Sequence, residues 1–339
     1  MRALLGLIVL CLIGAASAVA YVERQLSSSL PVTAEVVFDV APGATLGQVL
    51  RTLEAEGLLR DARVVEWIGR LRGDAARLKA GEYALRPGVT ADRLLEMLAT
   101  GEVYRRSFVL VEGWRMRDLR RALAAAPRLE STIEALDDAD LMQALERSGV
   151  AAEGRFFPDT YLYEAGSTDR ALLAQAAARL DAVLEEEWGA RLGDLPLQDP
   201  SEALVLASII EKETGAAADR AQIAGVFVRR LERGMRLQTD PTVIYGLGDA
   251  FDGNLRRRDL RDPHPWNTYV HEGLPPTPIA MPGRAAIRAA LHPADGNALY
   301  FVARGDGSSE FSETLEAHNA AVQRFQIEPA RRAAAGRTP

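Results

Sequence analysis

The chain has 339 residues, of which 48% are hydrophobic and 26% charged, the composition of a globular protein long enough for two domains. Its formal net charge of −7 argues against a nucleic-acid binder, which would present a basic face. One cysteine and four scattered histidines cannot form a closed zinc pattern. We therefore expect no nucleic-acid partner, no metal and no cofactor.

The first predicted element is an apolar helix at the N-terminus. After Arg2, twenty residues carry no charge until Glu23 is reached. Such a run can span a bilayer, and an arginine on its short N-terminal side favours a cytoplasmic N-terminus. We expect a transmembrane anchor over residues 1–23, with the rest of the chain exported. A cleaved signal peptide is the alternative, because Ala16-Ser17-Ala18 has the small residues of a cleavage site.

A polar, serine-containing segment over residues 24–34 is predicted to be a stalk, and an internal repeat follows it. Pro42-Gly43-Ala44-Thr45 and Pro87-Gly88-Val89-Thr90 are each followed by leucines and valines at identical offsets. Each copy predicts a strand, a Pro-Gly turn, a threonine N-cap and an amphipathic helix. A weaker third copy begins at Gly113.

Between the two clear copies, residues 61–71 are predicted to form another helix. The resulting strand-helix-helix-strand order over residues 35–86 resembles a LysM module, a small fold that often binds N-acetylated glycans. We therefore expect a LysM-like α/β module over residues 35–104. A structural spacer that binds nothing is the alternative interpretation.

The remainder of the chain predicts a larger mixed α+β domain over residues 105–326, followed by a flexible tail over 327–339, so that the fold class is α+β. Its predicted helices cover residues 117–126, 167–188, 200–214 and 217–233. The segment 252–282 contains six prolines but also several large apolar side chains. We expect it to be an ordered loop packed on the domain.

The predicted helix over 200–214 carries the strongest chemical signal. Asp199 can cap its N-terminus, Gly215 is a natural stop, and its apolar residues lie on every side, which indicates a buried helix. Glu211 then falls in the last turn, where burial and the helix dipole both raise the pKa of a carboxyl group. A raised pKa suits a general acid at neutral pH. The alternative is an ordinary solvated glutamate at a helix end.

Four sequence blocks make the second half similar to the endolytic murein transglycosylase family (MltG type, also called YceG-like). The blocks are Glu153-Gly154 with Phe157-Pro158-Asp159-Thr160-Tyr161; Ala207-Ser208-Ile209-Ile210-Glu211-Lys212-Glu213-Thr214; Met235-Arg236-Leu237-Gln238-Thr239-Asp240-Pro241-Thr242-Val243-Ile244-Tyr245-Gly246; and Asn267-Thr268-Tyr269 with Gly273-Leu274-Pro275-Pro276 and Pro282-Gly283. One departure is His264-Pro265-Trp266, where the family pattern has Ser-Pro-Tyr. The anchor and the LysM-like module fit the same family.

The resemblance implies a single-pass enzyme of the cell inner membrane, with a periplasmic catalytic domain that acts on nascent peptidoglycan. It would cleave the β-1,4 bond between N-acetylmuramic acid and N-acetylglucosamine within glycan strands and leave 1,6-anhydro ends. Peptidoglycan synthases are conceivable partners. The resemblance assigns the catalytic acid/base to Glu211.

Further residues of the matching blocks are candidates for contacts with the glycan. They are Glu213, Gln238, Thr239, Asp240, Tyr245, Asn267, Thr268 and Tyr269. Turn chemistry and core packing are the alternative roles for the polar residues and for Tyr245. Because Glu213 points roughly 200° away from Glu211 around a helix, the two cannot face one site, and we expect a structural or supporting role for Glu213.

Two other functions remain open from the sequence. A hydrolytic muramidase would need a second carboxylate to activate water, for which the sequence offers Asp240. A non-catalytic glycan-binding scaffold of the cell-wall machinery is the alternative outside the enzyme class.

Overall fold

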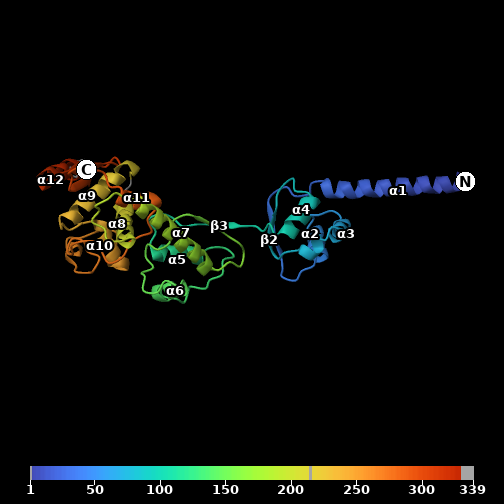
Figure 1. Ribbon diagram of the computed structural model, residues 1–339, viewed down its shortest axis with the longest axis horizontal. Helices are drawn as coiled ribbons and strands as arrows, with labels where there is room; N and C mark the ends of the chain where they lie inside the picture. The colour runs from blue at the N-terminus through green and yellow to red at the C-terminus, as the bar shows by residue number, and fades with distance from the viewer. Residues whose placement is uncertain (1, 214–215, 330–339) are drawn as a thin grey trace, which may run out of the picture. The chain divides into compact units, whose positions relative to one another are not determined.

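The computed structural model describes residues 2–213 and 216–329 (Figure 1). Thr214 and Gly215, predicted to end the helix that carries the candidate acid, lie outside the described residues. The same holds for residues 330–339 of the predicted tail.

The chain divides into two compact units. Unit 1 comprises the residues up to Ser107 together with Leu162–Ser167. Unit 2 comprises Phe108–Tyr161 and the residues from Thr168 onward. Both helices and strands occur, so the predicted mixed α+β class is confirmed.

Unit 1 begins with α1 (Arg2–Ser27), a long uninterrupted helix (Figure 1). Its stretch Leu4–Ser27 is long and apolar enough to cross a membrane, by length and composition. The helix continues beyond the predicted end of the anchor at residue 23. Leu26, and after the helix Leu30 and Val32, are buried in the core of unit 1. Part of the predicted stalk is therefore packed, because its few apolar side chains face that core.

The rest of unit 1 follows the predicted order. Its elements are β1 (Val36–Val40), α2 (Leu46–Ala55), α3 (Ala62–Leu71), the short 3-10 helix η1 (Asp74–Arg77), β2 (Gly81–Leu85) and α4 (Ala91–Thr100). The strands pair antiparallel, from Val36 opposite Leu85 to Val40 opposite Gly81. Thr45 and Thr90 cap α2 and α4 through their side chains, so both predicted N-caps are confirmed.

Unit 2 is built from helices with short two-stranded sheets. Two strands, β3 (Arg106–Val109) and β4 (Thr160–Tyr163), cross the boundary between the units. The other elements of unit 2 are α5 (Met116–Ala124), α6 (Asp138–Ala144), α7 (Asp169–Gly189), α8 (Pro200–Glu213), η2 (Ala217–Asp219), α9 (Arg220–Glu232), α10 (Asp240–Leu247), η3 (Gly248–Ala250), η4 (Asp259–Arg261), α11 (Arg284–Leu291), β5 (Tyr300–Ala303), β6 (Ser309–Ser312), α12 (Leu315–Val322) and the π-helix η5 (Gln323–Ile327). β3 pairs with β4, and β5 pairs with β6.

The helix α8 forms the centre of unit 2, with α7, α9, α10 and α11 packed around it (Figure 1). All residues from Ala203 to Ile210 are buried, as predicted from the apolar residues on every side of the helix. Asp199 accepts hydrogen bonds from the backbone N–H groups of Ser201 and Glu202, which confirms the predicted N-cap. The helix is therefore fixed at its start and buried along its middle, and its first and last turns reach the surface.

The proline-rich segment 252–282 is an ordered loop on this core, as predicted. It contains only the short helix η4, and Ile279 is buried while Trp266 and Leu274 pack against the core. The Oγ of Ser208 in α8 accepts a hydrogen bond from the backbone N–H of Ile279 at 3.0 Å. The end of the loop is thereby tied to the central helix.

The packing of the predicted stalk is testable with Leu30→Ala. Leu30 is 7% exposed, so its truncation is expected to lower the free energy of unfolding of unit 1 by about 2–3 kcal/mol. Leu71→Ala is the control, because Leu71 is 67% exposed and its loss should cost less than about 0.5 kcal/mol. Denaturant unfolding of the full chain in detergent, followed by circular dichroism, measures both. If both variants lose the same free energy of unfolding, the segment is an unpacked stalk.

Candidate active site

Glu211 occupies the last turn of α8, half-buried at the surface of unit 2. One of its carboxyl oxygens accepts a hydrogen bond from the backbone N–H of Gly283 at 3.0 Å. Burial is the main cause that raises the pKa of Glu211, and the negative charge of Glu112 raises it further. The Gly283 bond and the cations Arg220 and Lys212 oppose this shift without cancelling it. The predicted direction of the pKa is confirmed, so this carboxyl group is easier to protonate than that of an ordinary glutamate.

Two loops of unit 2 surround this carboxyl group and are bonded to each other. The N–H of Gly113 donates to the carbonyl of Met281, and the N–H of Met281 donates to the carbonyl of Trp114, both at 2.8 Å. The Nζ of Lys212 donates to the carbonyl of Gly113 at 3.2 Å. The backbone around Glu211 is thus held by the loop before α5 and by the end of the proline-rich segment.

Glu153 is a buried glutamate that supports the same loop. Both of its carboxyl oxygens accept from the backbone N–H of Met116, at 3.0 and 3.2 Å, in the first turn of α5. Burial raises the pKa of Glu153 to about 7, although the bonds from Met116 and Tyr245 and the charge of Arg115 oppose the shift. The sequence showed Glu153 only as part of a matching block, because nothing local indicates that it would be buried.

Tyr245 is directed toward this buried group. Its hydroxyl shares a hydrogen bond with Glu153, and its ring lies 5.5 Å from the ring of Trp266. The guanidinium of Arg115 lies 5.3 Å from the centre of the same ring. These contacts favour the packing role for Tyr245 over stacking on a sugar.

Glu213 lies in a second cluster, apart from Glu211, as the helical spacing predicted. Its carboxyl group accepts a hydrogen bond from the hydroxyl of Thr239, and burial raises the pKa of Glu213 to about 7. Asp240 accepts a hydrogen bond from the hydroxyl of Tyr269 at 2.6 Å. A cavity of about 440 Å³, which we call the Glu213 cavity, is lined by Glu213, Gln238, Asp240, Tyr269, Arg230 and Tyr300, among others.

Three of the expected glycan-binding residues are buried inside unit 2. Thr239, Asn267 and Thr268 are each 2% exposed or less. The Oγ1 of Thr268 accepts from the N–H of Thr239 at 3.1 Å, and the amide of Asn267 donates to the carbonyls of Asp259 and Asp262. Their side chains are used within the protein, where they fix the loop that presents Tyr269. The sequence could not separate these residues from their exposed neighbours.

Gln238 differs from these three because its side chain is exposed at the rim of the Glu213 cavity. Its backbone has φ +52°, a left-handed conformation that residues other than glycine rarely adopt. The N–H of Gln238 donates to the carbonyl of Thr268 at 3.1 Å, which helps to hold this strained turn. The strain is consistent with a functional position.

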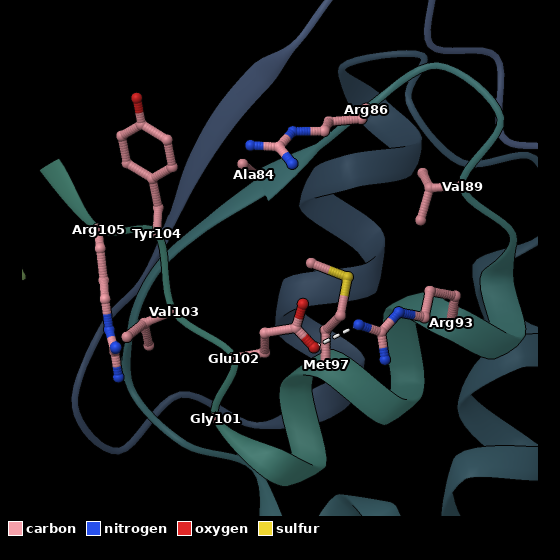
Figure 2. A pocket seen from close by; sticks show the side chains of 10 residues that line it. All are labelled: Ala84, Arg86, Val89, Arg93, Met97, Gly101, Glu102, Val103, Tyr104 and Arg105. Carbon is pink, nitrogen blue, oxygen red and sulfur yellow. Dashed lines mark hydrogen bonds and ion pairs between the residues drawn. The ribbon is translucent and has the colours of Figure 1, made fainter.

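Unit 1 has a cavity of its own, of about 700 Å³, which Figure 2 shows from close by. Arg86, Arg93, Tyr104 and Met97 are among the residues that line it. Arg93 forms ion pairs with Glu96 and Glu102, and Arg86 pairs with Glu35 at 2.7 Å. Its lining residues include none of the predicted site residues.

The fold and the site define a mixed α+β protein with a half-buried acidic glutamate at the end of its central helix. Residues 38–324 match the YceG-like family. The chain therefore belongs to this family, and the resemblance noted in the sequence is confirmed.

Individual relatives agree with this membership. The endolytic murein transglycosylase of Bacillus subtilis (strain 168) is 29% identical, over 86% of this chain and 84% of the relative. That of Streptococcus pneumoniae serotype 2 (strain D39) is 26% identical over 92% of this chain, which spans 63% of that longer relative. The crystal structure of a YceG-like protein from Listeria monocytogenes superposes with a TM-score of 0.55 at 28% identity, over 85% of this chain and 99% of that one. The expected lytic transglycosylase class agrees with the names of these relatives, whereas the LysM-like module stays a prediction.

The buried carboxyl of Glu153 predicts a specific dependence of stability on pH. Its pKa is about 7 in the folded protein and near 4.5 when unfolded, so its contribution to stability is fully present below pH 4.5 and is lost as the pH rises to 7. A neutral amide at this position does not undergo the same loss. The stability of Glu153→Gln relative to the wild type is therefore expected to rise by up to about 3 kcal/mol between pH 4.5 and 7.5.

Thermal unfolding of unit 2 across this pH range measures the difference. Glu185→Gln is the matched control, since Glu185 is an exposed glutamate. A constant difference between Glu153→Gln and the wild type at every pH would contradict a neutral, buried Glu153.

Proposed function

We propose that this protein is a membrane-anchored endolytic lytic transglycosylase of peptidoglycan, with Glu211 as its single general acid/base. The observation that carries the proposal is the half-buried carboxyl of Glu211, held by the N–H of Gly283 and favoured in its protonated form by burial. The names of the Bacillus and Streptococcus relatives support the substrate and the reaction class.

The chemistry requires one carboxyl group that acts twice. Protonated Glu211 donates its proton to the glycosidic oxygen between N-acetylmuramic acid and N-acetylglucosamine as the C1–O bond breaks. The C6 hydroxyl of the same muramic acid then attacks C1, and the Glu211 carboxylate accepts the hydroxyl proton. The products are a free N-acetylglucosamine end and a 1,6-anhydro end, with no water consumed. Such acid/base assistance is worth about 10²–10⁴ in rate.

The surroundings of Glu211 suit this cycle. The N–H of Gly283 engages one carboxyl oxygen, so the other can face a glycosidic oxygen. In the proposal, the exposed polar groups of the Glu213 cavity hold hydroxyl or N-acetyl groups of the strand further along. Thr239, Asn267 and Thr268 serve to position that cavity.

The proposed location is the inner membrane, with α1 as a single-pass anchor, a cytoplasmic N-terminus and a periplasmic catalytic unit. Length and composition of the apolar helix support an anchor. Glycan strands would be the substrate, unit 1 could hold them as a LysM-like module, and peptidoglycan synthases are candidate partners. Asp240, the sequence candidate for a water-activating base, lies beside Glu213, which disfavours it as the partner of Glu211 in a muramidase.

Product analysis tests the reaction. The full chain in detergent, incubated with uncrosslinked glycan strands, is expected to release fragments one water lighter than hydrolysis products, detected by mass spectrometry. Glu211→Gln should lose this activity by at least about a hundredfold, because an amide cannot donate the proton. Glu185→Gln is the control that should cleave normally.

The other outcomes of this experiment each identify a rival function. Fragments of the hydrolysed mass would make the protein a muramidase. No cleavage by the folded wild type, with strands still bound, would make it a scaffold.

The pH dependence of kcat/KM tests the acid role separately. Glu211 must be protonated in the free enzyme, so activity is expected to hold at low pH and to fall as the pH rises through the pKa of Glu211. Since that pKa is raised above its ordinary value of 4.5, the fall should occur above the range of an ordinary glutamate. A fall centred at the ordinary value, or no fall up to pH 9, would argue against Glu211 as the acid.

A further inference from the structure

Glu112 is an exposed glutamate in the loop before α5, and its carboxyl group lies directly over Gly283. A Cβ atom built on Gly283 would overlap Oε1 of Glu112. The same glycine donates its N–H to Oε2 of Glu211. Because both carboxyl groups touch one residue, their nearest oxygens lie within about 7 Å of each other.

The backbone that carries Glu112 is fixed at several points. Gly113 has φ +76° and is bonded in both directions to the loop that contains Met281. Glu153 holds the N–H of Met116 three residues further on. The backbone that presents Glu112 beside Gly283 is therefore held in place by the fold.

Glu112 gains nothing from ion pairing. Within the described part of the chain, no lysine or arginine forms an ion pair with it. Two neighbouring carboxyl groups repel each other when both are ionised, so the arrangement costs stability. Ionisable groups that the fold holds in an electrostatically unfavourable position are typical of catalytic sites.

We propose that Glu112 is a second catalytic residue, whose carboxylate contacts the reacting sugar and stabilises the positive charge that develops at C1 and the ring oxygen. The inference rests on the proposed function. Of the two groups, Glu211 is the more buried and has a raised pKa, whereas Glu112 is exposed. In this proposal Glu211 therefore supplies the proton and Glu112 supplies the negative charge.

The proton balance of the reaction is unchanged by this role. Glu112 forms no bond to the sugar and keeps its charge throughout, while one proton leaves Glu211 and another returns to it. Paired carboxyl groups in glycosidases lie about 5–9.5 Å apart, so the separation here allows a sugar ring to contact both. Asp240, the residue chosen from the sequence as a second carboxylate, lies in the other cluster.

The test is Glu112→Gln in the full chain in detergent, with uncrosslinked glycan strands as substrate. We expect kcat/KM to fall at least about tenfold, because a neutral amide no longer stabilises the cationic sugar. The pH at which activity falls should also move to lower values, since the lost negative charge had favoured protonated Glu211. Glu134→Gln, at an exposed glutamate elsewhere in unit 2, should leave both quantities unchanged.

Unchanged kcat/KM with an unchanged pH profile in Glu112→Gln would overturn the inference while leaving the proposed function intact. A lower rate with no movement of the pH profile would overturn the pairing with Glu211 and reduce Glu112 to a structural role.

A readout without substrate separates the failure of the proposed function from the failure of this inference. Thermal unfolding of the wild type, Glu112→Gln, Glu211→Gln and the double variant between pH 4 and 8 forms a double-mutant cycle. If the wild type cleaves nothing, the proposed function fails, and a coupling that grows as the pH rises still supports the carboxyl pair. Additive effects at every pH would overturn the pair independently of activity.

Discussion

The burial of α8 is the constraint on which the site depends. A helix with apolar residues on every side has to be surrounded, and the four helices packed on its buried middle leave its last turn at the surface. Glu211 therefore emerges at the border between core and solvent. Complete burial would deny the carboxyl group its substrate, and full exposure would let water keep it ionised. The half-buried position provides both access and a raised pKa.

The end of this one helix separates two groups of polar residues. Glu211 faces Gly283 and the loop of Glu112, whereas Glu213, two residues later, faces Thr239 and the Glu213 cavity. Burial raises the pKa of both glutamates, but Glu213 is committed to an internal hydrogen bond. A long polymer could contact both groups at once, since each lies at the surface of unit 2. The angular spacing of residues around one helix thus places two carboxyl groups, two positions apart in the sequence, in different surroundings.

The parts of this architecture that sequence could predict are those that local patterns determine. Threonine caps, the buried helix α8 and the ordered proline-rich loop follow from side-chain periodicity and turn chemistry, which act over a few residues. The raised pKa of Glu211 could be predicted because burial near a helix end follows from that same local pattern. The burial of Asn267 and Thr268 depends on which loops meet, which no local pattern contains. The packing of Leu30 was missed for the same reason, because its partners are distant in sequence.

The position of Glu112 near Glu211 could not be predicted from the sequence. Its loop was visible only as a weak repeat at Gly113, yet the fold joins that loop to Met281 through paired backbone hydrogen bonds. Gly283 has no Cβ, and the Glu112 carboxyl group occupies the space where a Cβ would lie, so a side chain there would require that carboxyl group to shift. One glycine thus donates its N–H to Glu211 and, because it has no Cβ, leaves space for the carboxyl group of Glu112. The chemistry of the site is determined as much by this backbone as by the glutamate in the motif.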